Sequence, residues 1–436
     1  MRFIVFLFLF IGPLSIEAQV EPEFPNRQAV VPMKKAGLST NVIQKAIDRI
    51  AAKGGGTVVI PKGRWSTGRI ELKSRVNLRI EKGAELHFSG KVKDYQPAVF
   101  TRNEGVEMMS LGACIYANGA ADIAITGEGS LVGPGRGCEI DTLEKNDSYL
   151  DMHVKAETPI GERLFDGQQG RRFFRPVFIG LMNCENVLVE DITMTKSIFW
   201  NIVTEYCNSV TIRGVNIDSY GTPRGDAIDI ESTSNVLIEH CNVNTTDDAY
   251  TLKAGRGQDG LRVNRPTENI VIRHCYAKNS AGGIAIGSET AGSIRNVYVH
   301  DCTFEDVKNG SYLKSRRIRG GGGSSITMER IKMIRPRTAF FWDMLGSARW
   351  VGALAERLPK RDITPLTPEF YDIHFKEIII EDCNRLIHAK GLPERPIRNV
   401  SFKDIQATGK ELIDVADLEE VTFENVKFNG LTIEWK

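Results

Sequence analysis

The chain contains a series of short apolar segments that recur along most of its 436 residues, each preceded by a polar corner. Short apolar runs between polar corners are typical of β-strands. The clearest segments begin at Val187, Val210, Val236, Ile270, Val297, Ile326, Ile373, Val400 and Val421. Their successive spacings are 23, 26, 34, 27, 29, 47, 27 and 21 residues. Such a repeat predicts a solenoid, in which each repeat packs on its neighbours.

The length and composition of the repeat select the class of solenoid. The repeats lack the leucine and asparagine signature of leucine-rich repeats, and a propeller blade would need about 40 to 50 residues and four antiparallel strands. We therefore predict an all-β fold, a right-handed parallel β-helix whose coils differ in their loops. No linker rich in Pro, Gly or Ser divides the sequence, so we expect residues 19–436 to form a single domain.

The N-terminal residues indicate export, followed by a capping helix. A single Arg precedes the apolar run 3–11, and the small residue Ala18 offers a cleavage site, as in a secretory signal peptide. No segment of the chain is long and apolar enough to span a bilayer. We expect residues 1–18 to be removed and the mature protein to be soluble, either periplasmic or secreted. A helical pattern from Thr40 ends at residues 54–56 and would cover the first coil.

Eight cysteines in an exported chain invite a disulfide framework, but their register favours buried thiols. Cys241, Cys275 and Cys302 each fall five residues after the start of an apolar segment. Cys184 and Cys207 each fall three residues before one. Residues at one register in successive coils stack inside a solenoid, and free Cys packs well as a small hydrophobe.

The charge balance narrows the choice of partners. The chain has 25% charged and 42% hydrophobic residues, which is ordinary for a globular protein, and a formal net charge of +1. A near-neutral chain without a long basic tract gives no support for a nucleic-acid partner. Local basic residues still allow an extended acidic substrate.

Two adjacent carboxylates, Asp247 and Asp248, lie between one apolar run and the next. Carboxylates held a few Å apart resist double ionisation, so one of them tends to keep a proton near neutral pH and can act as a general acid. The segment that starts at Asp226 superposes on the one that starts at Asp248 without a gap. On neighbouring parallel strands these two residues would lie roughly 4.8 Å apart. The three aspartates are candidates for hydrolysis, and turn capping is the alternative.

Four segments share this register, namely 226–231, 248–253, 282–287 and 309–314. Their alternate positions predict an inward ladder of apolar residues, made of Ile230, Leu252, Ile286 and Leu313.

The outward positions of the same segments hold polar and cationic groups. One column contains Glu231, Lys253, Gly287 and Lys314, and the next contains Asp229, Thr251, Ala285 and Tyr312. We expect an exposed sheet here, suited to an extended hydroxylated or acidic chain, although a Lys on a sheet is usually solvated surface. The candidate substrate-binding residues are Asp229, Lys253, Tyr312, Lys314, Arg316 and Glu289.

Two long stretches, 133–175 and 335–368, break the repeat. Long loops of a solenoid usually gather on one face, so we expect them to form walls of a binding groove. Plain surface decoration is the alternative.

The chain resembles the polygalacturonase family of glycoside hydrolases, family 28, in segments 225–229, 244–248, 282–289 and 313–315, with supporting similarity at 199–202. The resemblance implies a pectate-lyase-like β-helix that hydrolyses α-linked galacturonate polymers with inversion and needs no metal or cofactor. It also implies Asp247 as general acid, with Asp226 and Asp248 positioning and activating water. Inversion calls for acid and base carboxylates roughly 6.5 to 9.5 Å apart, which neighbouring strands can supply.

Two departures from the family pattern point to a changed substrate. Segment 280–283 lacks the family's His, which removes a partner that tunes the acid. Tyr312-Leu313-Lys314 stands where the family has Arg-Ile-Lys, and Tyr cannot replace the bidentate carboxylate clamp of Arg. Rhamnogalacturonan-cleaving members also lack the His and the Arg, although they have an Asp-Glu acid site. We therefore expect rhamnogalacturonan or a substituted galacturonan ahead of plain polygalacturonate.

Two other functions stay open. A β-helix uronate lyase would need a cation held by several carboxylates and would give an unsaturated product. A glycan-binding β-helix without activity would use the three aspartates only to shape turns. The expected partner in every case is a pectic saccharide, and we expect a monomer.

Overall fold

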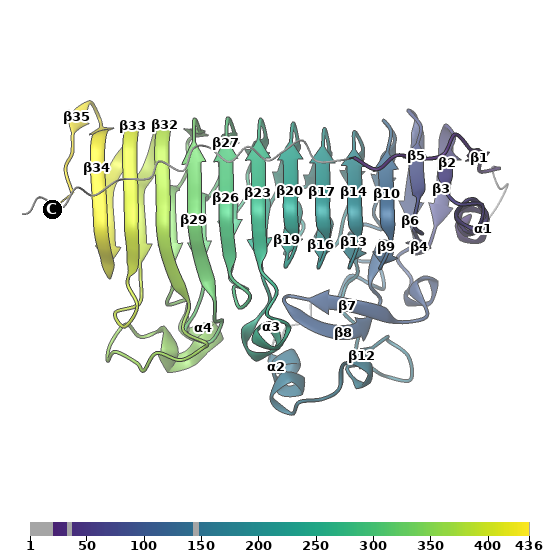
Figure 1. Ribbon diagram of the computed structural model, residues 1–436, viewed down its shortest axis with the longest axis horizontal. Helices are drawn as coiled ribbons and strands as arrows, with labels where there is room; N and C mark the ends of the chain where they lie inside the picture. The colour runs from purple at the N-terminus through teal and green to yellow at the C-terminus, as the bar shows by residue number, and fades with distance from the viewer. Residues whose placement is uncertain (1–20, 33–36, 143–147, 436) are drawn as a thin grey trace, which may run out of the picture.

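The computed structural model describes residues 21–32, 37–142 and 148–435. The predicted signal peptide and its cleavage site therefore lie outside the described residues. Within the described part of the chain, no helix is long and apolar enough to cross a membrane. The strands wind into one long parallel sheet that closes into three faces (Figure 1), which confirms the predicted right-handed parallel β-helix.

The first face carries the repeat seen in the sequence, and its strands stand side by side in Figure 1. Its strands are β1 (Gln28–Val30), β2 (Gly56–Ile60), β5 (Val76–Ile80), β10 (Ala121–Thr126), β14 (Glu185–Glu190), β17 (Asn208–Arg213), β20 (Ser234–Glu239), β23 (Thr267–Arg273), β26 (Ile294–His300), β29 (Gly322–Glu329), β32 (Glu369–Lys390), β33 (Ile397–Ala416) and β34 (Leu418–Phe428). All nine predicted strand starts pair in one unbroken ladder, from Val187 with Val210 to Val400 with Val421.

The second face holds the segments that carry the candidate site. Its strands are β4 (Ile70–Glu71), β9 (Ala113–Asn118), β13 (Val177–Met182), β16 (Ile202–Glu205), β19 (Ile228–Glu231), β22 (Tyr250–Lys253), β25 (Gly282–Ile286), β28 (Asn309–Lys314) and β31 (Thr338–Asp343). The long strands β32 and β33 turn the corner and complete this face. The predicted inward ladder is buried, with Ile230, Leu252 and Ile286 at 0% exposure.

The third face is made of short strands that follow the first face in each coil. They are β3 (Gly63–Thr67), β6 (Ala84–Phe88), β11 (Ser130–Val132), β15 (Thr193–Thr195), β18 (Asn216–Ser219), β21 (Asn242–Thr245), β24 (Tyr276–Lys278), β27 (Thr303–Glu305) and β30 (Lys332–Ile334). A final short strand, β35 (Leu431–Thr432), pairs antiparallel with β34.

The corners that lead into the first face continue as left-handed backbone within the first three residues of several strands. Asn235, Asn269 and Asn296 have φ near +60°, a region that Asn enters more readily than other L residues. Each side-chain amide donates to the side-chain oxygen of the Asn one coil earlier, with Asn235 bonding to Asn208. The polar corners of the sequence therefore stack into a hydrogen-bonded ladder.

The cysteines lie in the interior as predicted. Within the described residues, which include all eight, none forms a disulfide. Cys184 stacks on Cys207, and Cys241, Cys275 and Cys302 are buried one above another. The predicted capping helix is α1 (Thr40–Ala52), which buries Ile43 and Ile47 against the first coils.

Segments outside the solenoid gather along its lower edge in Figure 1. They are η1 (Val92–Tyr95), the antiparallel pair β7 (Val99–Asn103) and β8 (Val106–Ser110), α2 (Ser148–Lys155), η2 (Ile160–Glu162), β12 (Leu164–Phe165), α3 (Gly257–Val263), α4 (Ala348–Val351) and η3 (Gly352–Ala355). The prediction of a long loop over residues 335–368 is wrong at the start of that range, because residues 338–343 form strand β31 of the second face. Its aromatic residues alternate inward and outward there, which marks a strand.

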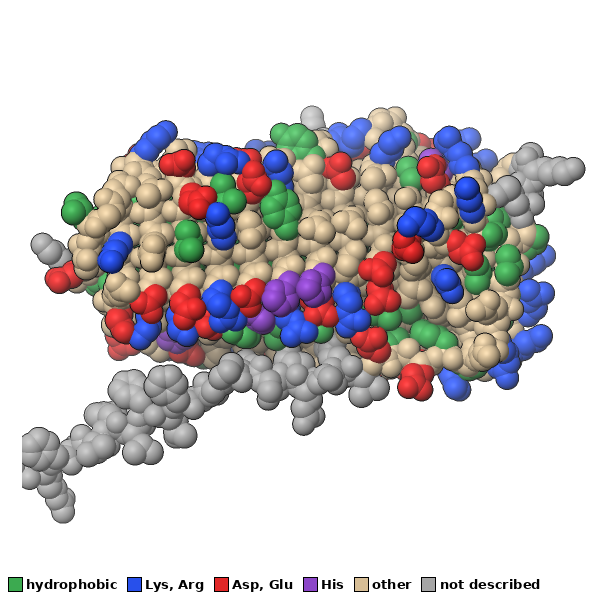
Figure 2. Space-filling model, turned by 90° about the horizontal axis from the view of Figure 1, so that it is seen from above, with side chains coloured by type: hydrophobic (Ala, Val, Ile, Leu, Met, Phe, Trp, Pro, Cys, Tyr) green, Lys and Arg blue, Asp and Glu red, His purple; other side chains and the backbone are tan. Residues whose placement is uncertain are grey.

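The surface seen from above carries acidic and basic side chains mixed in one band, with a group of His side chains within it (Figure 2). His240 and His274, on successive coils, stack with ring centroids 5.1 Å apart.

Candidate active site

The three candidate aspartates meet at the entrance to the second face. Asp226 lies two residues before β19, and Asp248 lies two residues before β22. The two strands pair Ile228 with Tyr250 and Glu231 with Lys253, which is the register expected from the sequence. One carboxylate oxygen from each of Asp226, Asp247 and Asp248 lies within 4.8 Å of the others.

Backbone hydrogen bonds hold the three residues to neighbouring coils. The backbone N–H and the side-chain amide of Asn201 both donate to the carbonyl of Asp226, each at 2.9 Å. Ala227 donates to the carbonyl of Asp248 and Ala281 donates to that of Asp247, each at 2.9 Å. These carbonyls are tied into the sheet, so the carboxylates project from fixed backbone.

Two lysines from the second face neutralise part of the cluster. Lys253 Nζ lies 3.0 Å from Asp226 Oδ2 and also bonds to Asp229. Lys314 Nζ lies 2.6 Å from Asp248 Oδ2. Both Asp226 and Asp248 are buried, whereas Asp247 is half-buried and has neither lysine as an ion-pair partner. Asp247 is therefore the member of the three that is most open to a ligand.

Burial sets the proton affinities of this cluster. It raises the pKa of Asp226 well above its ordinary value although Lys253 opposes the shift, and it raises the pKa of Asp229 to about 6. It also raises the pKa of Asp248, against the ammonium of Lys314. Burial lowers the proton affinity of lysines, yet Asp229 and Asp226 keep the pKa of Lys253 well above its usual range. The pKa values of Asp226, Asp229 and Asp248 therefore depend on one another and on the two nearby ammonium groups.

Gly282 and Tyr312 shape the space above Asp248. A Cβ at residue 282 would lie 3.0 Å from Asp248 Oδ1 and 3.0 Å from Tyr312 Cδ1. A side chain at this position would therefore point at the carboxylate and crowd the tyrosine ring. Asp248 Oδ1 is buried and has no hydrogen-bond partner among the residues described. The segment that lacks the expected His is thus the one that faces this oxygen.

The expected exposed sheet is wrong for the columns that contain Asp229 and Lys253. Both side chains are almost fully buried, at 0% and 4% exposure. Arg102, which lies in strand β7, donates to Ser232 Oγ at 3.0 Å and lies 3.7 Å from Glu231. Segments far away in the sequence therefore cover this part of the face, and Asp229 and Lys253 support Asp226 from below.

The other candidate ligands lie closer to the surface or join a second charged group. Tyr312 and Lys314 are half-buried, with Lys314 Nζ 4.3 Å from the Tyr312 ring centre. Arg316 is half-buried and lies over the Trp350 ring at 5.4 Å, so it contacts the 344–368 loop. Glu289 is buried.

Glu289 is surrounded by Arg and Lys side chains, and the sequence pattern indicates only some of them. Burial would raise the pKa of Glu289, but Arg319, Lys253 and Arg256 lower it to about 2. Arg319 lies 3.6 Å from Glu289 and belongs to the basic run 314–319, so its charge could have been noticed in the sequence. Arg256 lies in no motif, so the sequence offered no signal for it.

Trp200 is a further residue that the candidate set lacks. Its ring centre lies 4.3 Å from Lys253 Nζ, on the coil before Asp226. Trp200 falls in segment 199–202, which resembles the family, so the sequence contained a signal that could have identified it.

A metal could find oxygen ligands here only in competition with the lysines. The three carboxylates approach one another closely enough to share an ion. Calcium, however, takes six to eight oxygens, and Lys253 and Lys314 already bind oxygens of Asp226 and Asp248. The donor set therefore suits a proton-sharing cluster better than a cation site.

Comparisons with known proteins found a matching family and several relatives. The family model "Glycosyl hydrolases family 28" matches residues 161–337, which include all three aspartates. An exo-poly-alpha-D-galacturonosidase from Dickeya chrysanthemi is 24% identical, covering 90% of this chain and 69% of that protein. An endo-polygalacturonase from Pectobacterium carotovorum subsp. carotovorum is 27% identical, covering 89% and 88%. The structure of a hyperthermoactive exopolygalacturonase from Thermotoga maritima superposes with a TM-score of 0.85 at 26% identity, covering 95% and 94%.

Proposed function

Because the chain belongs to glycoside hydrolase family 28, we propose that it is an exported hydrolase of α-linked galacturonate in pectic saccharides. The observation that carries the proposal is the cluster of Asp226, Asp247 and Asp248 against two lysines. Residues 19–436 would form one catalytic domain after removal of residues 1–18. Within pectin, we expect rhamnogalacturonan or a substituted galacturonan to be preferred over plain polygalacturonate.

The charge balance of the cluster allows it to keep the proton that hydrolysis needs. Asp226, Asp229, Asp247 and Asp248 face two ammonium groups, so full ionisation would leave two uncompensated negative charges at a largely buried site. Such a cluster retains a proton. We assign the role of general acid to Asp247, the most open of the three catalytic candidates, which would donate a proton to the oxygen of the glycosidic bond as that bond breaks.

Asp226 and Asp248 would act on the water. Each has one oxygen bound to a lysine, so the other oxygen is left to orient a water molecule and accept its proton as the new C–O bond forms. A carboxylate held by a lysine is a weaker nucleophile toward the sugar carbon, which favours attack by water and hence inversion.

The separation of the carboxylates differs from the expected 6.5 to 9.5 Å, because their nearest oxygens lie within 4.8 Å of one another. The three side chains start from adjacent residues or adjacent coils, which brings them closer than a pair on opposite walls of a cleft. Proton NMR of the first products separates the outcomes. Inversion gives the β-anomer from an α-linkage, and the α-anomer would overturn the proposed roles of Asp226 and Asp248.

Gly282 and Tyr312 support a changed specificity. The Tyr312 ring fills space that a larger side chain at residue 282 would need, so the absence of the His and the replacement of the Arg are coupled in space. Tyr312 offers a ring face and a hydroxyl, where the family's Arg would clamp a carboxylate. A sugar without a carboxylate, such as the rhamnose of rhamnogalacturonan, suits this position.

The test compares products from polygalacturonate and from rhamnogalacturonan oligosaccharides by mass spectrometry, using wild type, Asp247→Asn and Asp218→Asn. Asp218 is an exposed aspartate of strand β18 that pairs with Asn244 on the next coil, so its variant controls for loss of one negative charge. We expect hydrolysis chiefly of rhamnogalacturonan, abolished only in Asp247→Asn. Faster cleavage of polygalacturonate would overturn the preference, an unsaturated product would indicate a lyase, and binding without products would indicate a glycan-binding protein.

A further inference from the structure

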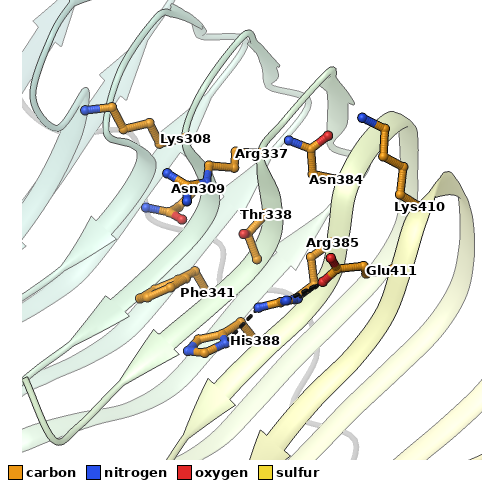
Figure 3. A pocket seen from close by; sticks show the side chains of 10 residues that line it. All are labelled: Lys308, Asn309, Arg337, Thr338, Phe341, Asn384, Arg385, His388, Lys410 and Glu411. Carbon is orange, nitrogen blue, oxygen red and sulfur yellow. Dashed lines mark hydrogen bonds and ion pairs between the residues drawn. The ribbon is translucent and has the colours of Figure 1, made fainter.

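A second hollow lies on the same face as the aspartates, toward the C-terminus. It has a volume of about 590 Å³ and is lined from β28, β31, β32 and β33 (Figure 3). Lys308, Arg337 and Lys410 stand along one edge, and Phe341 and His388 along the other. We name it the distal pocket.

The strand register connects the distal pocket to the aspartates. Gly282, on the coil after Asp248, pairs with Asn309, which pairs with Thr338, and the row continues through Arg385 to Glu411. At about 4.8 Å per strand, the pocket begins roughly 10 Å from Asp248 and extends to about 24 Å. A saccharide lying across the strands at the aspartates would therefore reach the pocket after a few sugar units.

The edge of the pocket is strongly cationic. Lys308, Arg337 and Lys410 are exposed, and none of them makes an ion pair within the described part of the chain. Other exposed cations of these coils do have partners: Arg335 lies 2.7 Å from Asp306, and Lys332 lies 2.8 Å from Glu381. The three pocket cations thus stand out from the paired charges of the surrounding surface.

The edge of the pocket opposite the cations is a row of rings that begins near the aspartates. Tyr312, Phe341 and His388 occupy successive strands at one register. The Phe341 and His388 rings stack with centroids 4.7 Å apart, and Tyr312 meets Phe341 edge-on at 5.5 Å. Arg385, beside them, is already neutralised by Glu411. Aromatic surface with a few polar groups at its edge is typical of a ligand site.

We propose that the distal pocket binds a carboxylate-bearing unit of an acidic saccharide, several sugar units from the bond that is cleaved. This rests on the proposed function, because it gives that substrate chain a second anchoring point. Cations on one edge would bind the carboxylate, and the ring row would contact the apolar face of the sugar. The enzyme would then require an acidic unit at the pocket although Tyr312 disfavours one nearer the aspartates.

The experiment measures binding by calorimetry in the Asp247→Asn protein, so that turnover does not interfere. The probes are hexagalacturonate, its carboxyl-reduced form and digalacturonate. The double variant Arg337→Gln/Lys410→Gln removes two pocket cations from exposed positions. The control Lys45→Gln/Lys62→Gln removes two exposed cations at the opposite end of the solenoid. Phe341→Ala tests the ring row.

The pocket variant should bind hexagalacturonate about tenfold more weakly or worse, since charge-assisted hydrogen bonds are lost. The control should bind it like the parent, and neither variant should change binding of digalacturonate. Phe341→Ala should weaken hexagalacturonate binding as well. Equal affinity of parent and pocket variant for hexagalacturonate, or parent binding of the reduced form as tight as of the acid, would overturn the proposal.

Turnover distinguishes this inference from the proposed function. If the pocket variant weakens hexagalacturonate binding but wild type cleaves no pectic saccharide, the pocket stands and the hydrolase proposal fails. If wild type cleaves pectic saccharides and the pocket variant binds hexagalacturonate like its parent, the pocket fails and the hydrolase stands.

Discussion

At the scale of single residues, the site depends on how lysines offset the burial of carboxylates. Lys314 bonds to Asp248 and opposes the rise in the pKa of that carboxyl that burial causes. The lysine therefore keeps Asp248 ionised to lower pH than burial alone would allow. If ionised Asp248 accepts the proton of water, the acid side of the pH–rate profile reports on this pair.

We predict that Lys314→Gln moves the acid limb of kcat/KM to higher pH by about 1 to 3 units, the usual effect of one close opposite charge. Without the ammonium, the pKa of Asp248 rises further, so its ionised form appears only at higher pH. The measurement is the pH–rate profile on rhamnogalacturonan oligosaccharides. Lys332→Gln, which removes an exposed lysine on the third face, should leave the limb in place. A lower rate with an unmoved limb would contradict this role.

Glu289 shows the opposite balance, because the effect of the surrounding cations outweighs that of burial and lowers its pKa to about 2. A carboxyl with a depressed folded-state pKa stabilises the fold above its unfolded pKa, near 4.3, and loses that contribution as pH falls toward 2. We predict that Glu289→Gln lowers the free energy of unfolding by about 3 kcal/mol at pH 7. In urea titrations the difference from wild type should shrink steadily below pH 4. A difference that is constant with pH would mean that packing, not charge, is responsible.

At the scale of elements, the corners decide where each strand starts. Asn269 has φ of 59°, donates to Asn235 at 2.9 Å and accepts from Asn296 at 2.6 Å. Asn269→Ala should lose both bonds and suffer left-handed strain, at a total cost of about 2 kcal/mol. Asn269→Gly loses the bonds but tolerates the backbone, so it should cost only about half as much. Equal losses in urea unfolding would show that the backbone conformation contributes nothing.

The same corners explain which elements the sequence could predict. Val187 and its eight counterparts form one ladder because the period fixes both the strand and its inward residues. Asp226 and Asp248 could be placed on adjacent coils for the same reason. The β7–β8 pair could not be predicted, since it packs outside the solenoid and repeats nothing. The burial of Asp229 and Lys253 beneath such segments was missed with it.

At the scale of the whole molecule, a solenoid has two ends, and each end exposes a strand edge unless something covers it. At the N-terminal end α1 serves this purpose, because Ile43, Ile47 and Ile50 are buried against the first coils. The aspartates lie several coils away, just before β19 and β22. In a repeat protein each coil is stabilised mainly by its neighbours, so the cap and the site should be separable.

We therefore predict that Ile47→Asp detaches α1 without abolishing catalysis. An unpaired carboxylate buried at this position costs several kcal/mol, more than one interface with a single helix can offset. The exposed first coil should then self-associate, as seen by light scattering, and proteases should cut within residues 40–52. Lys45→Asp, on the exposed side of the same helix, should show neither effect. Hydrolysis by the monomeric fraction of Ile47→Asp should stay within about twofold of wild type, since the coils around β19 and β22 keep their own neighbours. Loss of activity together with a single cooperative unfolding transition at lower urea would instead mean that the cap and the catalytic coils fold as one unit.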